Sequence, residues 1–472
     1  MNLIQSLIKK YRSLSAPVKA SVWALFCSVF QSAASLITTP VFTRLLSQDD
    51  FGIYSQYSSW LGILSIIITL DLYSEAYMKG ITEHEEDEDA FTASMLWLNL
   101  AIFTLFLVIF LLAPSFWAKV LHLSPYLTGL MFVHLLASFP FDYWKSRERY
   151  HYRYKLSTLL SVIITVFGYA FSIYAITHLS NRLHARIEGE LLIRILVAAP
   201  LLIILLRKTK YIYNREIWTF ALSFSLPLIP HFLSNLVLSQ SDRLMIGRLV
   251  SDSASAKYSI AYMIASMVLM IVNAVNSSYV PYTFQKLRDR QEASLRSSSS
   301  LLLGGIALLC VIGMGLAPEV ITIFAGESYA EAAMIVPDVS ASVFFIFVYT
   351  LFSNVEYYFK ETKLVGIATL LAAGLNVLLN AILIPRLGYT VAGTTTLVSY
   401  LFLALFHYVC YQRIQKKQQL ETVYDLRIIL LVSAGLLGVT LIIRTLFHLP
   451  LIRYLIVAAS VPLSAWLLLK KR

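Results

Sequence analysis

Charged residues are scarce in this chain. Of its 472 residues only 14% are charged, whereas 58% are hydrophobic, and the mean hydropathy is +0.70. Soluble globular domains contain about 45–50% apolar and about 25% charged residues. No soluble fold has enough interior to bury this excess of apolar surface, so part of it must face lipid. The composition therefore excludes a soluble enzyme, a disordered scaffold and a disulfide-stapled secreted domain. It predicts an all-α polytopic membrane protein.

Cysteines are also few, and catalytic motifs are lacking. Cys27, Cys310 and Cys410 stand singly in apolar stretches, without the spacing of a metal or redox site. The chain has no P-loop, no GxSxG elbow and no HExxH motif. We therefore expect no catalytic residue, no bound metal and no resident cofactor. The chain is not expected to be an enzyme or to hydrolyse ATP itself.

Long apolar runs fill most of the chain. A spanning helix needs about 20 mostly apolar residues, and the sequence contains fourteen such candidates with no soluble domain between them. The segment HLSNRLHARIEGE, between the fifth and sixth candidates, is predicted to be a polar break. The fourteen predicted spans lie near 20–45, 52–78, 91–112, 127–145, 157–178, 188–206, 217–240, 256–280, 298–317, 334–359, 363–384, 390–411, 425–443 and 451–469.

The distribution of lysine and arginine predicts the topology. With both termini inside, the inside segments carry most of the 38 Lys and Arg residues, as the positive-inside rule requires. The net charge of +11 has the same explanation, so nucleic acid is not an expected partner. Residues 1–19 have an apolar stripe flanked by lysines, which predicts an amphipathic helix on the inner membrane surface. The acidic run 83–89 is expected to be a solvated loop.

An internal repeat links the two halves of the chain. RLLSQDDFGIYS, which begins at Arg44, aligns without gaps with RLVSDSASAKYS, which begins at Arg248. Each copy lies at the end of one predicted span and the start of the next, and six spans separate the copies. Because an even number of spans preserves orientation, we expect parallel six-helix repeats, an architecture typical of transporters.

Both copies resemble signatures of the polysaccharide exporters, the Wzx-type O-antigen and capsule flippases. The string TTPVFTRLLSQDDFGIYSQY has the proline, basic, acidic, glycine and tyrosine positions of the first signature at Pro40, Arg44, Asp50, Gly52 and Tyr54. The second signature is matched by Pro227, Asp242, Arg243 and Tyr258, although the family usually has glycine where this chain has Ala256 or Lys257. SNVEYYFKETK, in the tenth span, is also typical, so the resemblance covers essentially the whole chain.

The resemblance implies the multidrug/oligosaccharidyl-lipid/polysaccharide exporter fold and a role as a flippase. Such proteins move undecaprenyl-diphosphate-linked oligosaccharides across the bacterial cytoplasmic membrane for surface polysaccharide, which is O-antigen, capsule or exopolysaccharide. The expected divisions are an amphipathic segment at 1–19, six-helix lobes at 20–210 and 211–412, and two further helices with the tail at 413–472. Expected partners are the lipid-linked oligosaccharide, membrane lipids, a polysaccharide polymerase and a chain-length regulator.

Charged residues at membrane depth are costly and usually face a cavity. A lipid-linked diphosphate favours arginine, whose guanidinium can fork two phosphate oxygens. Asp71 and Glu75 are four apart on the second predicted span and would share one helix face. The candidate substrate-binding residues are Arg44, Arg194, Arg243, Arg248, Asp71, Glu75, Asp142, Asp242, Glu356, Tyr54 and Tyr258.

Each candidate has an alternative role. Arg44 and Arg248 lie near helix ends and could instead extend to lipid headgroups, whereas Arg194 lies further inside its predicted helix. The acidic residues could bind a coupling proton or sodium ion, or pair with arginines as bridges between helices. Asp242 is expected to form a local clasp with Arg243.

Two other functions compete with the flippase. An ion-coupled small-molecule or drug antiporter of the same superfamily would have a cavity dominated by carboxylates, whereas a diphosphate requires a net cationic one. A membrane-embedded polymerase or glycosyltransferase would need a large outer loop or a sizeable non-membrane domain, and the chain has neither.

Overall fold

The computed structural model describes residues 15–469, and side chains as far as Pro462. The described residues form helices joined by short turns, with no β-strand among them. The helix predicted over residues 1–19 therefore lies mostly outside the described residues, and its last residues belong to the first spanning helix, α2 (Ala16–Leu45).

Every predicted span coincides with a helix or with a broken helix. Eleven helices are long and apolar enough to cross a membrane, and two bent pairs raise this number to thirteen. The fourteenth prediction falls on α19 (Pro450–Leu469), whose described apolar stretch, Pro450–Pro462, is shorter. The other helices are α3 (Gln48–Thr69), α4 (Glu75–Glu83), α5 (Glu88–Leu112), α6 (Pro114–Leu121), α7 (Pro125–Tyr150), α8 (Tyr154–His178), α9 (Arg182–Leu206), α10 (Arg215–Ser225), α11 (Ile229–Leu249), α12 (Asp252–Arg288), α13 (Glu292–Gly315), α14 (Ala317–Ala325), α15 (Val336–Tyr358), α16 (Thr362–Leu387), α17 (Val391–Lys417) and α18 (Leu426–Thr445).

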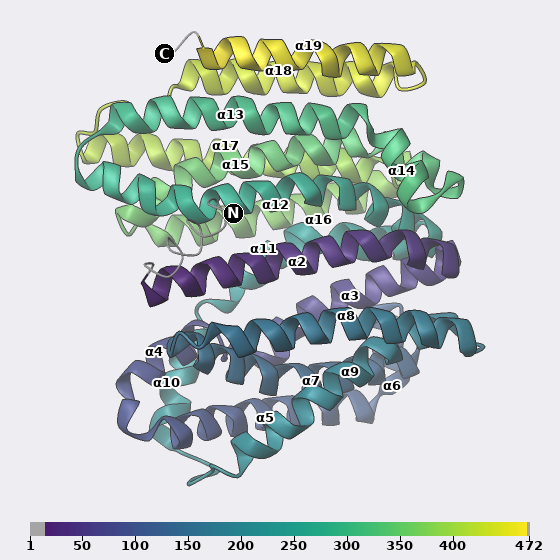
Figure 1. The fold of residues 1–472 in the computed structure, drawn as a ribbon, viewed down its shortest axis with the longest axis vertical. Coiled ribbons are helices and arrows are strands. Elements are labelled where there is room, and N and C mark those ends of the chain that lie inside the picture. The colour runs from purple at the N-terminus through teal and green to yellow at the C-terminus, as the bar shows by residue number, and fades with distance from the viewer. Residues whose placement is uncertain (1–14, 470–472) are drawn as a thin grey trace, which may run out of the picture. The chain divides into compact units, whose positions relative to one another are not determined.

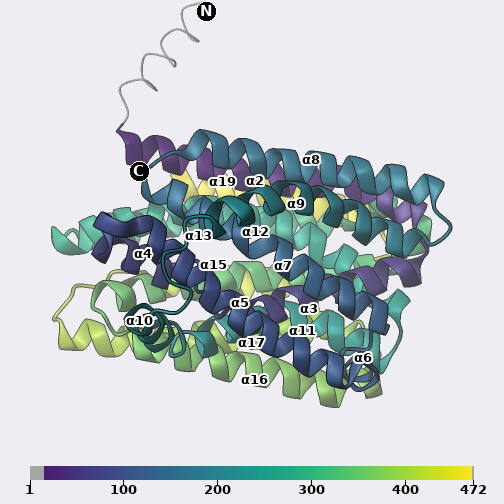
Figure 2. The ribbon, with the colours of Figure 1, turned by 90° about the horizontal axis from the view of Figure 1, so that it is seen from below.

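The chain forms two compact units. The first comprises Met1–Leu46 and Tyr57–Leu233. In it, α8 lies along α9 and α2 lies along α8 (Figures 1 and 2). Its main apolar core joins α5 and α7 to α4 and α10 through buried residues such as Tyr77, Phe91, Phe139 and Tyr143.

The second unit comprises Ser47–Gln56 and Ser234–Arg472. Its central helix is α15, in which Val336–Val348 is buried on every side. A helix with apolar residues all round needs neighbours on all faces, and α12, α13, α17 and α18 supply them. The two C-terminal helices, α18 and α19, pack along α13 (Figure 1).

The boundary between the units differs from the expected division at residue 210. Helix α10 packs on α4 and α5, so the first unit continues to Leu233. Ile217 and Ala221 are buried on this face of α10, and the Trp218 indole donates a hydrogen bond to the Ser94 carbonyl at 3.1 Å. After this face the chain bends by 47° between α10 and α11.

The internal repeat is confirmed at its two turns. Helix α2 ends at Leu45 and α11 at Leu249, the residues that the sequence alignment pairs. In each turn the aligned serine caps the next helix: Ser47 Oγ accepts from the Asp50 N–H at 3.0 Å, and Ser251 Oγ from the Ala254 N–H at 3.1 Å. The shared capping chemistry explains why this part of the repeat is visible in the sequence.

Both repeat turns pack together within the second unit. A Cβ added at Gly52 would lie 1.9 Å from the Asp252 carbonyl oxygen, so the α3 backbone makes its closest approach here. The Gln56 amide donates to the Asp252 carboxylate at 2.6 Å, and Gly247 leaves room for the same Gln56 side chain. Only glycine fits at position 52 without displacing the backbone of α12.

Arginines anchor the C-terminal helices to the second unit. Arg453 of α19 is 4% exposed and contacts Glu319 at 2.8 Å and the Gly315 carbonyl at 2.6 Å. Arg444 of α18 pairs with Asp338 at 3.1 Å. Among the described residues, both arginines therefore form ion pairs that join the C-terminal helices to the rest of the unit.

Replacing Arg453 by glutamine should loosen α19. The Arg453 hydrogen bonds lower the pKa of Glu319 from 4.5 to about 2. A lowered carboxyl pKa means that the stabilisation is fully present above pH 4.5 and is lost as the pH falls towards 2. The melting temperature of Arg453→Gln in detergent should therefore lie below wild type by a similar amount at pH 7 and pH 5. If the variant and the wild type had the same melting temperature at each pH, this role would be contradicted.

Candidate functional site

A polar cavity lies inside the first unit. It has a volume of about 160 Å³ and is lined by residues of α2, α7, α8 and α9. Two predicted site residues, Arg194 and Asp142, both line it. The remaining lining residues are Gln31, Phe141, Lys145, Ser161, Ile164, Thr165, Tyr169 and Glu190.

Arg194 is held loosely at this cavity. Its guanidinium donates to the Ser138 hydroxyl at 3.4 Å and lies 3.9 Å from the Glu190 carboxylate. Its Nε is buried and has no hydrogen-bond partner among the described residues. A buried donor without a partner costs about 1–3 kcal/mol, so the protein's own groups leave Arg194 incompletely satisfied.

Two charged residues behind Arg194 were missed in the sequence. Arg186 and Glu190 fall in the predicted polar break. The break is present between α8 and α9 but is shorter than predicted, because α9 already begins at Arg182. Arg186 is 2% exposed, pairs with Glu190 at 2.9 Å, and stacks on the Phe42 ring at 4.1 Å. The four-residue spacing of Arg186, Glu190 and Arg194 is the signal that could have found them, since it places all three on one helix face.

The cavity lining contains charges of both signs. Arg194 and Lys145 are cationic, whereas Asp142 and Glu190 are acidic. Because Arg186 pairs with Glu190 from behind the cavity, the local balance shifts towards positive. The arrangement provides fixed cationic donors for a phosphate and carboxylate or amide groups for sugar hydroxyls.

The second unit contains a buried polar cluster around Asp242 of α11. Its carboxylate accepts hydrogen bonds from Tyr258 at 2.5 Å, Thr396 at 2.7 Å and Asn380 at 2.6 Å. Asn376 joins the cluster by accepting from Ser241 at 2.9 Å. Four helices thus meet at one carboxylate, and both of its oxygens are satisfied by neutral donors.

The predicted clasp between Asp242 and Arg243 is wrong. Adjacent helical residues point in different directions, so Asp242 is buried while Arg243 turns to α12. There Arg243 stacks on the Tyr262 ring at 4.6 Å and donates to the Ser239 carbonyl at 3.2 Å. Among the described residues it forms no ion pair with an acidic side chain.

Glu356 of α15 pairs with a histidine. The sequence left open a bridge to arginine or a site for a coupling ion, and Glu356 Oε1 forms a 2.7 Å hydrogen bond with His407 Nδ1 of α17. Both side chains are fully buried. The histidine was missed as a partner because it stands alone in an apolar stretch far away in the sequence.

Four other candidates lie near helix ends or turns. Arg44 and Arg248 are exposed at the ends of α2 and α11, as headgroup contacts would be. Glu75 is exposed at the start of α4, and Tyr54 is half-buried in α3.

Asp71 lies at a break rather than on a continuous helix. Leu70 and Asp71 have φ values of 51° and 50°, which end α3 at Thr69. Asn99 of α5 donates to the Thr69 carbonyl at 2.9 Å, so it stabilises the helix end. The predicted shared helix face of Asp71 and Glu75 is therefore wrong.

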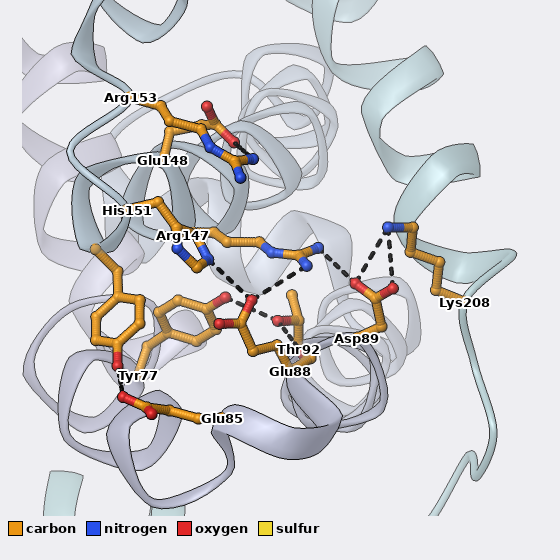
Figure 3. Close-up of polar contacts among 11 residues, drawn as sticks. Tyr77, Glu85, Glu88, Asp89, Thr92, Arg147, Glu148, His151, Arg153 and Lys208 are labelled. Carbon is orange, nitrogen blue, oxygen red and sulfur yellow. Dashed lines mark hydrogen bonds and ion pairs between the residues drawn. The ribbon is translucent and has the colours of Figure 1, made fainter.

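The acidic run is largely paired within the first unit. Arg147 of α7 bridges Glu88 at 3.3 Å and Asp89 at 2.6 Å (Figure 3). His151 also contacts Glu88, and Lys208 also contacts Asp89. The prediction of a solvated loop is wrong for these two acids, because they open α5, where the helix dipole favours carboxylates.

The fold is that of transporters of the MOP superfamily. A lipid II flippase, MurJ, in an inward closed conformation has a TM-score of 0.68 at 14% identity, covering 94% of this chain and 98% of that one. A multidrug resistance MATE transporter in an inward-facing conformation gives 0.62 at 13% identity, covering 82% and 96%. A MOP transporter from Pyrococcus furiosus, described as having a binding pocket of reversed polarity, gives 0.57 at 14%, covering 85% and 95%.

The chain belongs to the polysaccharide biosynthesis protein family, whose model matches residues 18–287. No functionally curated protein matches its sequence significantly. The chain thus combines membership of this family with the fold of MOP-superfamily transporters and with eleven or more helices that could span a membrane.

Proposed function

We propose that this protein moves an undecaprenyl-diphosphate-linked oligosaccharide across the bacterial cytoplasmic membrane during synthesis of a surface polysaccharide. The observation that carries the proposal is the cavity of the first unit, where Arg194 and Lys145 offer cationic donors beside acceptors for sugar hydroxyls. A diphosphate cannot enter hydrocarbon without such partners. Flipping is driven by a proton or sodium gradient, and the polymerase and chain-length regulator act on the product.

The similar flippase supports the lipid-linked substrate. MurJ is described as a lipid II flippase, and its chain is covered over 98% of its length. The competing hypothesis, a drug antiporter, is supported by the MATE transporters, which share the fold at lower TM-scores. Arg194 and Lys145 of the cavity fit an anionic lipid head, whereas its carboxylates, Asp142 and Glu190, are the groups that a cationic drug would use.

Deletion of the gene tests the function. Surface polysaccharide should be lost, and its lipid-linked precursor should accumulate on the inner face of the membrane. Complementation by the wild-type chain should restore both. Unchanged polysaccharide together with altered drug sensitivity would favour the antiporter.

The topology has its own test. Reporter fusions at Gly326, which follows α14, should report outside, and fusions at Lys416, near the end of α17, should report inside. The reason is the lysine and arginine bias, which favours a topology with both termini in the cytoplasm. The reverse pattern would overturn the orientation proposed here.

A further inference from the structure

Glu356 and His407 form a buried ionisable pair in the second unit. Glu356 Oε1 and His407 Nδ1 are 2.7 Å apart, and both side chains are 0% exposed. Both belong to helices that are long and apolar enough to span a membrane. Ionisable residues in such segments are costly and generally serve a function.

One polar atom on each side of the pair has no partner. Glu356 Oε2 and His407 Nε2 are buried and make no hydrogen bond among the described residues. Asp242 provides the contrast, because its two oxygens accept from Tyr258, Thr396 and Asn380. The Asp242 cluster is thus complete as a structural element, whereas the Glu356–His407 pair has free capacity to bind.

The charge of the pair identifies what it can bind. With Glu356 ionised and His407 neutral, the pair carries one buried negative charge, and a single proton neutralises it. Glu356 forms no ion pair with lysine or arginine in the described part of the chain. The titratable neighbours are Tyr349, whose ring stacks on His407 at 5.5 Å, together with Tyr357 and Cys410.

A metal ion is a poor fit for this pair. One carboxylate and one imidazole are too few protein ligands for a transition metal. The described residues contain no group of three or more histidine, cysteine or acidic side chains that could hold a metal. A proton needs only the two atoms that are already present.

A separate cavity of about 410 Å³ lies close to the pair. Its lining includes Phe352, one helical turn from Glu356 on α15, and Tyr411, one turn from His407 on α17. Gln412, Gln415 and Lys416 give it a polar wall. Because Lys416 lies on the expected inner side, this cavity is expected to face the cytoplasm, one helical turn from the pair.

We infer that Glu356 and His407 form a proton-binding site of the transporter, which exchanges with the cytoplasm through the adjacent cavity. The inference rests on the proposed function only for its role in coupling. Proton binding would convert the pair from negative to neutral, and this change in buried charge provides the energetic bias between conformations that a gradient can use.

Infrared spectroscopy of the purified full-length protein tests proton binding directly. A carbonyl-stretch band of a buried protonated carboxyl should grow as the pH is lowered. It should be absent in Glu356→Gln and shifted in His407→Gln. Asp242→Asn, which alters another fully buried carboxylate of this unit, should keep the band. A band that persists in Glu356→Gln, or is lost only in Asp242→Asn, would overturn the assignment.

Transport in vesicles tests the coupling. Wild-type export should depend on an imposed pH gradient, whereas Glu356→Gln and His407→Gln should lose that dependence. The His407 variant provides a second test if the Glu356 variant does not fold. Normal dependence on the gradient in a folded variant would refute the coupling role. If the wild type shows the infrared band but moves no lipid-linked oligosaccharide, the proton site stands and the proposed function fails.

Discussion

Surface polysaccharide should be lost when Arg194 is replaced by alanine, while the amount of inserted protein stays unchanged. The guanidinium lines the first-unit cavity, where its contact with Ser138 is long and its Nε has no partner. A charge-assisted hydrogen bond contributes about 1.5–3 kcal/mol, which corresponds to a loss of about 10- to 100-fold in substrate binding. Quantitative immunodetection of the polysaccharide and of the tagged transporter would measure both effects.

A matched control lies on the same chain segment. Arg207 follows the last residue of α9 and is exposed, so Arg207→Ala removes the same charge away from the cavity. This variant should export normally. Arg194→Lys should be intermediate, since lysine restores the charge but not the fork. Undiminished export in Arg194→Ala would remove Arg194 from the mechanism.

A second large effect is expected at Gly52. Its position lies so close to the Asp252 carbonyl oxygen that an added Cβ would be 1.9 Å away. Because the obstacle is backbone, the α3 turn must move, and such overpacking costs at least about 1–3 kcal/mol. Gly52→Ala should therefore lower the melting temperature and the yield of monodisperse protein in detergent.

Gly305 provides the comparison for this prediction. It lies in α13 of the same unit, and a Cβ there would meet nothing within 4 Å. Gly305→Ala should be neutral or slightly stabilising, because alanine favours a helix over glycine by about 1 kcal/mol. Equal stability of the two alanine variants would show that the turn at Gly52 is free to move.

The membrane spans could be predicted from the sequence because each is a continuous apolar run of sufficient length. The break at Leu70 and Asp71 could not, since hydropathy does not change there. It depends on positive φ angles and on Asn99, which reaches the Thr69 carbonyl from another helix. The start of α9 was missed because hydropathy does change there: its charged residues are typical of a loop, although they lie in the helix.

The candidate site was predictable in part. Arg194 and Asp142 were selected as isolated charges in apolar runs, and both line the same cavity. The pairing of Arg186 with Phe42 and of His407 with Glu356 could not be predicted, because only the fold brings these partners together. Phe42 lies far from Arg186 in the sequence, as Glu356 does from His407.

The order of the chain and the composition of its units do not coincide. Residues 47–56 belong to the second unit although they lie early in the chain. Helix α10 belongs to the first unit although it follows the loop at 207–214, where the sequence predicted the division. A gene fragment that ended in this loop would therefore encode neither unit completely. Chimeras between related exporters should be joined near Leu233 and should exchange residues 47–56 as well. A single crossover in the loop at 207–214 would combine segments of different parents within both units.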